Sequence, residues 1–219
     1  MNQDYKQLRE NAIARLLDQP DAYLIIEKIN DLLRDEQILL SNFYINNLNG
    51  EKSEFINGSI IPISSSSSQE AVGLFLARLL DEFIIDISTS FLIFDAMVAF
   101  TRNCYRPNIC FYRKEKTLFI ESLPVLPPPN FVVEILGFST QVSHRILKFL
   151  DYQAHKIEEY WIVDPENQTI EQYHLVDDEY NLILKSSQGH IESFVIEGFK
   201  IPIAAMFNDA ENLKALQNF

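Results

Sequence analysis

The sequence predicts an α/β (α+β) protein, in which a mixed β-sheet is flanked by helices and preceded by a helical extension. Apolar residues recur at helical spacing through residues 1–49. From residue 90 the pattern changes to short β-rich runs separated by turn residues, and one helical segment at about 141–155 interrupts them. We therefore expect a helical extension over 1–49, one domain over 50–210 and a C-terminal tail over 211–219.

The individual elements can be placed in chain order. Pro20 divides the extension into two helices. Asn57-Gly58 lies between two short apolar runs and predicts a hairpin turn, and a serine-rich loop then leads into a helix at about 69–83. The next expected strands are FLIFDAMVAF, NICFY, LFIES, NFVVEIL, YWIVD, TIEQYHLV and NLILK. Beyond them we expect a strand over 191–196 and a loop over 198–202.

Composition limits the classes of function. The 31 acidic residues outnumber the 18 basic ones and give a net charge of −13, so any contact with DNA would need a local basic patch. Charged residues interrupt the longest apolar region, which excludes a membrane span. The two cysteines show no metal-ligand or disulfide pattern, and the polar N-terminus is no signal peptide. These features favour a cytoplasmic protein.

One carboxylate, Glu134, interrupts the apolar run NFVVEIL. On a strand it shares a face with Val132 and Leu136, whereas Val133 and Ile135 point into a core. An ionised carboxylate on such a strand needs a cation, a metal ion or an opening to water. A salt-bridged or rim-exposed glutamate would satisfy this requirement equally well. Further along, Glu159 and Asp164 are expected to be ordinary strand-end residues.

The helix expected at 141–155 adds a second charged group. Its apolar stripe consists of Val142, Ile146, Phe149 and Leu150, and the opposite side carries His144, Lys148, Asp151, Tyr152 and His155. That side is either solvated surface or, at Lys148, close to the C-terminal end of the Glu134 strand. A carboxylate with a lysine at a strand end is a minimal set for metal-dependent hydrolysis of phosphodiesters.

Four blocks of sequence carry a family resemblance: SEFINGSII at 53–61, YRPNICFYRKEK at 105–116, PNFVVEILGFST at 129–140 and KFLDYQAHKIEEYWIVDP at 148–165. With these blocks the chain resembles the Uma family, which is classed among restriction endonucleases with the PD-(D/E)XK nuclease fold. The resemblance implies a restriction-endonuclease-like sheet and a site that uses Mg²⁺ or Mn²⁺. It implies Glu134 as a metal carboxylate, Lys148 as the lysine supplied by the helix, and Glu54 as a supporting acid.

Several acidic positions of the family pattern are neutral here. Asn108 and Asn130 follow the prolines where the family has Pro-Asp, Ser59 replaces an acid, and His144 stands at the position of an acid. Asn108 keeps a metal-facing carbonyl oxygen but lacks the charge, so we expect weak or absent binding of Mg²⁺ or Mn²⁺. His144 could replace the missing acid as a general base, although a solvated histidine on a helix face is the commoner case.

Two functions therefore remain open. The chain is either a metal-dependent DNA endonuclease with an impaired metal site, or an inactive nuclease-fold module that binds nucleic acid or a protein partner. The most basic stretch, 102–116, offers Arg106, Arg113, Lys114 and Lys116 as phosphate ligands, or as a solvated strand edge. The analogy with nucleases that cut both strands favours a homodimer.

Overall fold

A mixed six-stranded β-sheet forms the centre of the computed structural model, which describes residues 2–47, 52–85, 90–117, 120, 123–137 and 142–219. The strand order is β10-β9-β8-β7-β6-β3, and only β7 and β8 run parallel. The strands are β3 (Phe91–Phe94), β6 (Ile109–Tyr112), β7 (Phe131–Ile135), β8 (Glu159–Asp164), β9 (Thr169–Val176) and β10 (Glu179–Ser186). The predicted fold class, a mixed sheet flanked by helices, is confirmed.

A smaller four-stranded sheet of order β2-β1-β5-β4 lies beside the central one. Its strands are β1 (Ser53–Ile56), β2 (Ser59–Pro62), β4 (Val98–Ala99) and β5 (Cys104–Tyr105). The β1–β2 hairpin turns at Asn57 and Gly58, whose φ angles are 49° and 81°. Two successive left-handed residues suit Asn-Gly, so the predicted hairpin is confirmed at the residues that indicated it.

Helices cover both faces of the central sheet, except for α1 and α2, which form an arm. In chain order the helices are α1 (Asn2–Leu17), α2 (Ala22–Asn46), α3 (Ser67–Ile84), α4 (Lys114–Thr117), α5 (Val142–Ala154), the 3₁₀ helix η2 (Ile203–Met206) and α6 (Asp209–Leu216). The core on one face joins α3, η2 and α6 to Val133 and Ile135, as the alternation of β7 predicted. On the other face, Val132 packs with α5 and with the four-stranded sheet.

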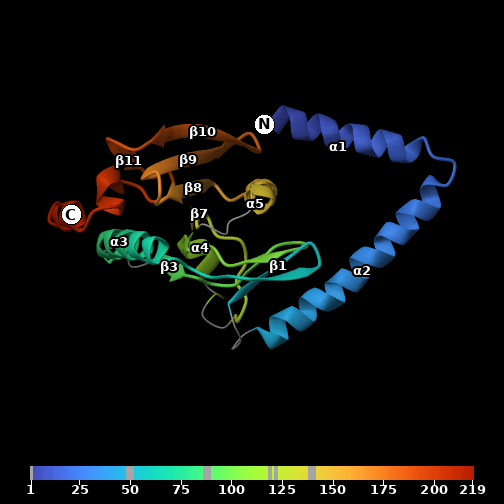
Figure 1. Cartoon of the computed structure of the whole chain (residues 1–219), viewed down its shortest axis with the longest axis horizontal. Coiled ribbons are helices and arrows are strands. Elements are labelled where there is room, and N and C mark those ends of the chain that lie inside the picture. The colour runs from blue at the N-terminus through green and yellow to red at the C-terminus, as the bar shows by residue number, and fades with distance from the viewer. Residues whose placement is uncertain (1, 48–51, 86–89, 118–119, 121–122, 138–141) are drawn as a thin grey trace.

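The arm formed by α1 and α2 extends away from the rest of the chain (Figure 1). Its final turns join the body, because Leu40 and Phe43 pack against Phe55 of β1. At the other end, the residues expected as a C-terminal tail contribute to α6 and continue beyond it. The division of the chain at residues 49 and 210 stays a prediction.

Several expected strands differ in the structure. The run FLIFDAMVAF is split between β3 and β4, because Asp95 adopts a φ of 53° and redirects the chain into the other sheet. The strand expected over 191–196 is only β11 (His190–Glu192), and the expected loop over 198–202 contains its partner β12 (Lys200–Pro202). In the run LFIES, Ile120 lies in a 3₁₀ turn, and the other residues lie outside the described ones.

Candidate active site

Three charged side chains meet at the C-terminal end of β7. The Nζ atom of Lys148 lies 3.0 Å from Oε1 of Glu134 and 2.8 Å from Oε1 of Glu54. All three side chains are largely buried, with exposed fractions between 8% and 12%. The structure thus brings together residues from β7, α5 and β1. When both carboxylates are ionised, this cluster carries a net charge of −1.

Helix α5 places Lys148 beside Glu134 and Glu54 because the polar side of the helix faces the sheet. The sequence left open whether this side is solvated surface, and the structure excludes that reading. Lys148 is only 12% exposed, His155 and Asp151 are 21% and 17% exposed, and Tyr152 is fully buried. Asp151 accepts hydrogen bonds from Asn103 at 2.7 Å and from the Tyr105 hydroxyl at 2.9 Å. These polar contacts give the charged face of α5 its buried partners.

Tyr152 is a member of the cluster that sequence reasoning missed. Its hydroxyl donates a hydrogen bond of 2.5 Å to the Glu134 Oε1 atom that also contacts Lys148. Burial, followed by the charge of Glu134, raises the pKa of Tyr152 well above its ordinary value, so the hydroxyl keeps its proton. Tyr152 follows Lys148 by four residues and therefore projects from the same face of the helix. This spacing was the available signal.

Opposing effects fix the charges of the cluster. Burial and the nearby charge of Glu54 raise the pKa of Glu134, and the Lys148 ammonium and the Tyr152 hydroxyl oppose that rise only in part. Burial alone would lower the pKa of Lys148, but the attraction of Glu134 and Glu54 outweighs it and raises this pKa. Lys148 is therefore a permanent cation between two acids.

Asn108 lines the same cleft. Ile109 pairs with Val133 across β6 and β7, which places Asn108 opposite Glu134 at the next position of the ladder. Its Oδ1 atom accepts a hydrogen bond of 2.7 Å from the Ile135 amide. An aspartate could keep this bond with one oxygen and present its second oxygen where asparagine has its amide nitrogen.

The cleft has a volume of about 110 Å³, well above the ~10–15 Å³ that one water molecule needs. Its lining includes His144, Gln69 and Arg106 in addition to the charged cluster. The Gln69 amide donates a hydrogen bond of 2.9 Å to the carbonyl of Ile135, and Gln69 also forms the capping box of α3 with Ser66. This contact joins the start of α3 to the end of β7, which carries Glu134.

The oxygen atoms that line the cleft are of the kind that a hard divalent cation prefers, but too few of them are carboxylates. Carboxylate and amide oxygens from Glu54, Glu134 and Asn108 are the ligand types that Mg²⁺ prefers. Among the described residues, however, no group of three or more His, Cys, Asp or Glu side chains is arranged to hold a metal ion. Both acids already contact Lys148. A cation would therefore meet two carboxylates that share one ammonium group.

The predicted basic patch divides into two places. Arg106 lines the cleft, where its guanidinium donates to the carbonyl of Asp95 at 3.1 Å. Arg113 and Lys116 lie near the start of β7, about 13 Å from Glu134 along a strand that rises ~3.3 Å per residue. Lys114 belongs, with Lys116, to the short helix α4.

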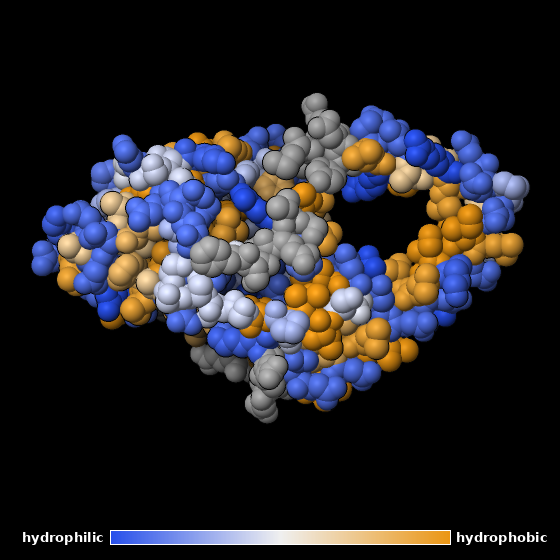
Figure 2. Space-filling view, viewed as in Figure 1, coloured by the Kyte–Doolittle hydropathy of each residue, from blue (hydrophilic) through white to orange (hydrophobic). Residues whose placement is uncertain are grey.

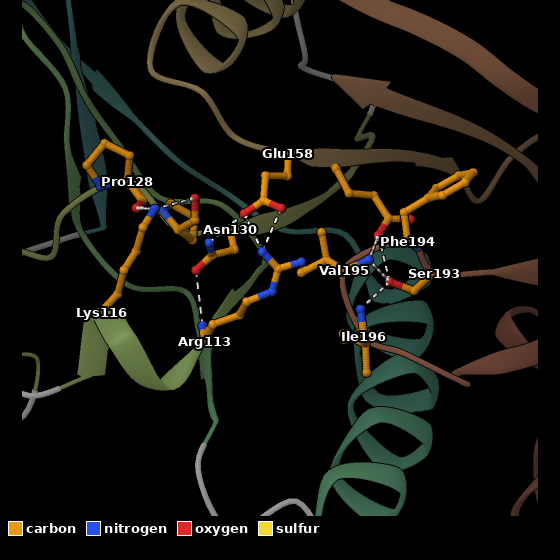
Figure 3. A network of polar contacts seen from close by, with 11 residues as sticks. Arg113, Lys116, Pro128, Asn130, Glu158, Ser193, Phe194, Val195 and Ile196 are labelled. Atoms are coloured by element: carbon orange, nitrogen blue, oxygen red, sulfur yellow. Dashed lines mark hydrogen bonds and ion pairs between the residues drawn. The ribbon is translucent and has the colours of Figure 1, made fainter. Parts of the chain in front are cut away.

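Figure 3 shows the contacts that Arg113 and Lys116 already make. Arg113 pairs with Glu158 at 2.6 Å, and its amide donates to Asn130 Oδ1 at 3.0 Å. Lys116 donates to the carbonyl of Pro128 at 3.0 Å, and burial lowers its pKa. These cations serve local structure, and their binding of nucleic acid stays a prediction.

Glu159 is more than the strand-end residue expected from the sequence. It is fully buried and accepts hydrogen bonds from Trp161, Gln172 and Ser193 at 2.6 to 2.7 Å. The amides of Phe194 and Val195 donate to it at 3.0 Å. Because these amides bond to a carboxylate, residues 193–196 form the loop labelled in Figure 3 in place of the expected strand. Glu159 is thus a structural anion outside the cleft.

The sheet and its helices define the class of the protein, a nuclease-like fold. A crystal structure described as "a putative nuclease belonging to DUF820 from Anabaena variabilis" superposes with a TM-score of 0.62 and 17% identity, covering 71% of this chain and 89% of that one. The chain belongs to the Uma2 family, described as "Putative restriction endonuclease", whose model matches residues 19–204. It is also 30% identical over 132 residues to "Uncharacterized protein sll1609" of Synechocystis, covering 58% of this chain and 75% of that protein. No helix in the described parts of the chain has the length and apolarity to cross a membrane.

Proposed function

We propose that the chain is a metal-dependent DNA endonuclease of the PD-(D/E)XK type with an impaired metal site. The observation that carries this proposal is the convergence of Glu134, Glu54 and Lys148 in a cleft that also contains Asn108. Membership of the Uma2 family supports a nuclease-type activity. The three charged groups are those that hydrolysis of a phosphodiester requires.

Each residue has a distinct role in this proposal. Glu134, Glu54 and the Asn108 carbonyl oxygen would hold Mg²⁺ or Mn²⁺, which when bound would supply an activated water. Lys148 stabilises the negative charge that develops on the phosphate. Tyr152 orients the Glu134 carboxylate through its hydrogen bond. His144 lines the cleft and is the candidate general base. Arg106 is the member of the predicted basic patch that lies near enough to contact the DNA backbone there.

The impairment follows from the charges. With asparagine at position 108, the cluster offers a cation a net charge of −1, because Lys148 offsets one of its two acids. An aspartate would double that charge. We therefore expect weak or absent binding of Mg²⁺ and slow cleavage.

The alternative is a catalytically inactive nuclease-fold module that binds nucleic acid or a protein partner. One observation favours it: Lys148 is paired with both acids, so the cluster is electrostatically satisfied without a metal ion. The formal charge of −13 also opposes contact with DNA outside a local basic surface. The homodimer and the cytoplasmic location expected from the sequence stay predictions.

Calorimetric titration with Mn²⁺ and nicking of supercoiled plasmid separate the two functions. The endonuclease proposal expects weak Mn²⁺ binding and slow nicking, both of which Glu134→Gln should abolish. Glu159→Gln is the matched control, because it changes a buried glutamate outside the cleft. Nicking that persists in the Glu134→Gln variant would show a contaminating nuclease. Absence of both binding and nicking would leave the inactive module as the function.

A further inference from the structure

Helix α2 carries an apolar stripe that extends beyond the part of the helix that packs against the body. Ile26, Ile29, Leu33, Leu40 and Phe43 follow one another at the alternating three- and four-residue steps that place side chains on one helix face, with only Glu36 interrupting them. Such spacing is typical of a face that packs against other helices. The stripe is wide, because neighbouring positions are also apolar.

Only the C-terminal part of this stripe is covered. Leu40 and Phe43 are 4% and 1% exposed where they contact the body, whereas Ile26, Ile29 and Leu33 are 37% to 41% exposed. The same face therefore passes from a packed core into open surface within two helical turns. Figure 1 shows the reason, since the arm continues beyond the body.

The direction of the arm is fixed by polar contacts at its base. Arg102 donates to both carboxylate oxygens of Glu36, at 2.7 and 2.8 Å. The Gln37 amide donates to the carbonyl of Thr101 at 3.1 Å. These contacts hold the C-terminal half of α2 against the body, and the stripe continues along the helix beyond them. They also neutralise Glu36, the one charge within the stripe.

The exposed apolar surface of the arm is large. Of the 23 large hydrophobic side chains that are exposed in the described parts of the chain, 12 lie on α1 and α2. Figure 2 shows these apolar residues along the arm, around the opening between the arm and the body. The exposed members of the stripe, Ile26, Ile29 and Leu33, together with the neighbouring Leu32, present on the order of 300 Å² on one face, which is the size of the largest apolar patch on a typical monomer.

We propose that this arm is a dimerisation surface whose occupant is the arm of a second copy of the chain. Two α2 stripes related by a twofold axis would place apolar faces together, with the α1 helices completing a helical bundle. Glu36, the one charge within the stripe, is already paired with Arg102. A lipid surface fits less well, because membrane-surface helices are rich in Lys and Arg, and residues 2–47 contain eight acidic and five basic side chains.

The test measures the mass of the full-length chain by light scattering coupled to size exclusion. We expect the wild type at about twice 25.4 kDa. Ile29→Glu should raise the dimer dissociation constant at least ~100-fold, because it places a charge inside an apolar interface. Ile38→Glu is the matched control, since Ile38 lies on the opposite face of α2 and is 59% exposed; it should remain dimeric.

Fluorescence of Trp161, the single tryptophan and fully buried in the body, reports whether each variant is folded. A wild type that is monomeric at micromolar concentration would overturn the proposal, including a monomer that binds lipid vesicles. Equal dissociation of the two variants would also overturn it. Dissociation of Ile29→Glu alone, with an unchanged Trp161 unfolding transition, would establish the stripe as the interface.

Discussion

Replacing Asn108 by aspartate restores the charge that the metal site lacks. Asn108 stands opposite Glu134 across β6 and β7, and its Oδ1 atom is already fixed by the Ile135 amide. Aspartate is nearly isosteric, so the backbone contact should survive the substitution. The second oxygen would then face the cleft that Glu134 and Lys148 line.

The size of the effect follows from Coulomb interactions inside the cleft. Two unit charges ~4 Å apart interact by about 4 kcal/mol at an effective dielectric of ~20, and a divalent cation feels twice this attraction. Dehydration of the cation and competition from Lys148 offset most of it. We expect a net gain of about 1.4–2.7 kcal/mol, which is roughly a 10- to 100-fold lower dissociation constant for Mn²⁺. Without metal, the added carboxylate should destabilise the protein, because it faces Glu134.

Two measurements check this prediction. Calorimetric titration gives the Mn²⁺ dissociation constant of the wild type and of Asn108→Asp. Thermal unfolding with chelator and with Mn²⁺ shows whether the metal restores the stability that the new charge removes, because a ligand that binds only the folded state raises its stability. Nicking of plasmid DNA by Asn108→Asp should be faster than by the wild type and should depend on Mn²⁺.

Asn130→Asp is the matched control, since it makes the same change in the second Pro-Asn pair. Asn130 donates to Glu158 at 2.7 Å at the other end of β7, so an aspartate there should lower stability without improving metal binding. The reasoning is refuted if Asn108→Asp and the wild type bind Mn²⁺ equally. It is also refuted if the gain persists when Glu134→Gln is added, because the cation would then bind elsewhere.

Three further predictions concern stability and reactivity. Tyr152→Phe removes a hydrogen bond to Glu134 and should cost about 1.5–3 kcal/mol in urea unfolding; a loss under ~0.5 would contradict it. Burial raises the pKa of Cys104 to about 12, so native protein should resist thiol alkylation at neutral pH and react only after unfolding. The Arg102 hydrogen bond lowers the pKa of Glu36 below 4.5, so its stabilisation, at most ~1 kcal/mol, exists at neutral pH and is lost on acidification through the folded pKa. Thermal melts of Glu36→Gln should therefore differ from the wild type at neutral pH and converge with it in acid.

The sequence predicts those parts of the fold that rest on local chemistry. The hairpin at Asn57-Gly58 forms because two adjacent residues must adopt positive φ, which this dipeptide tolerates. The inward face of β7 follows from simple alternation. A family resemblance directed attention to Glu134 and Lys148, and the structure places them in contact. Their catalytic roles remain a prediction.

The sequence misleads where polar groups are buried. An amphipathic helix normally turns its charged side to water, so the pattern of α5 could not show that Lys148 and Tyr152 face the sheet. Glu159 was missed for the same reason, because its five donors come from segments up to 36 residues away. Burial of a charge depends on partners that only the folded chain brings together.

The position of Lys148 explains why catalysis and a purely structural role are so difficult to separate. Removal of this lysine would leave two buried carboxylates without their ion-pair partner, which typically costs about 3–5 kcal/mol, so a Lys148 variant would be destabilised under either function. Substitution of Glu134 removes both the metal ligand and the partner of Lys148. Asn108 differs, because it lines the cleft without taking part in the ion pairs among the described residues. An aspartate at position 108 adds a negative charge to the cleft and leaves the ion pairs of Lys148 in place. The change in Mn²⁺ affinity of Asn108→Asp therefore distinguishes a weakened enzyme from a stable ion cluster.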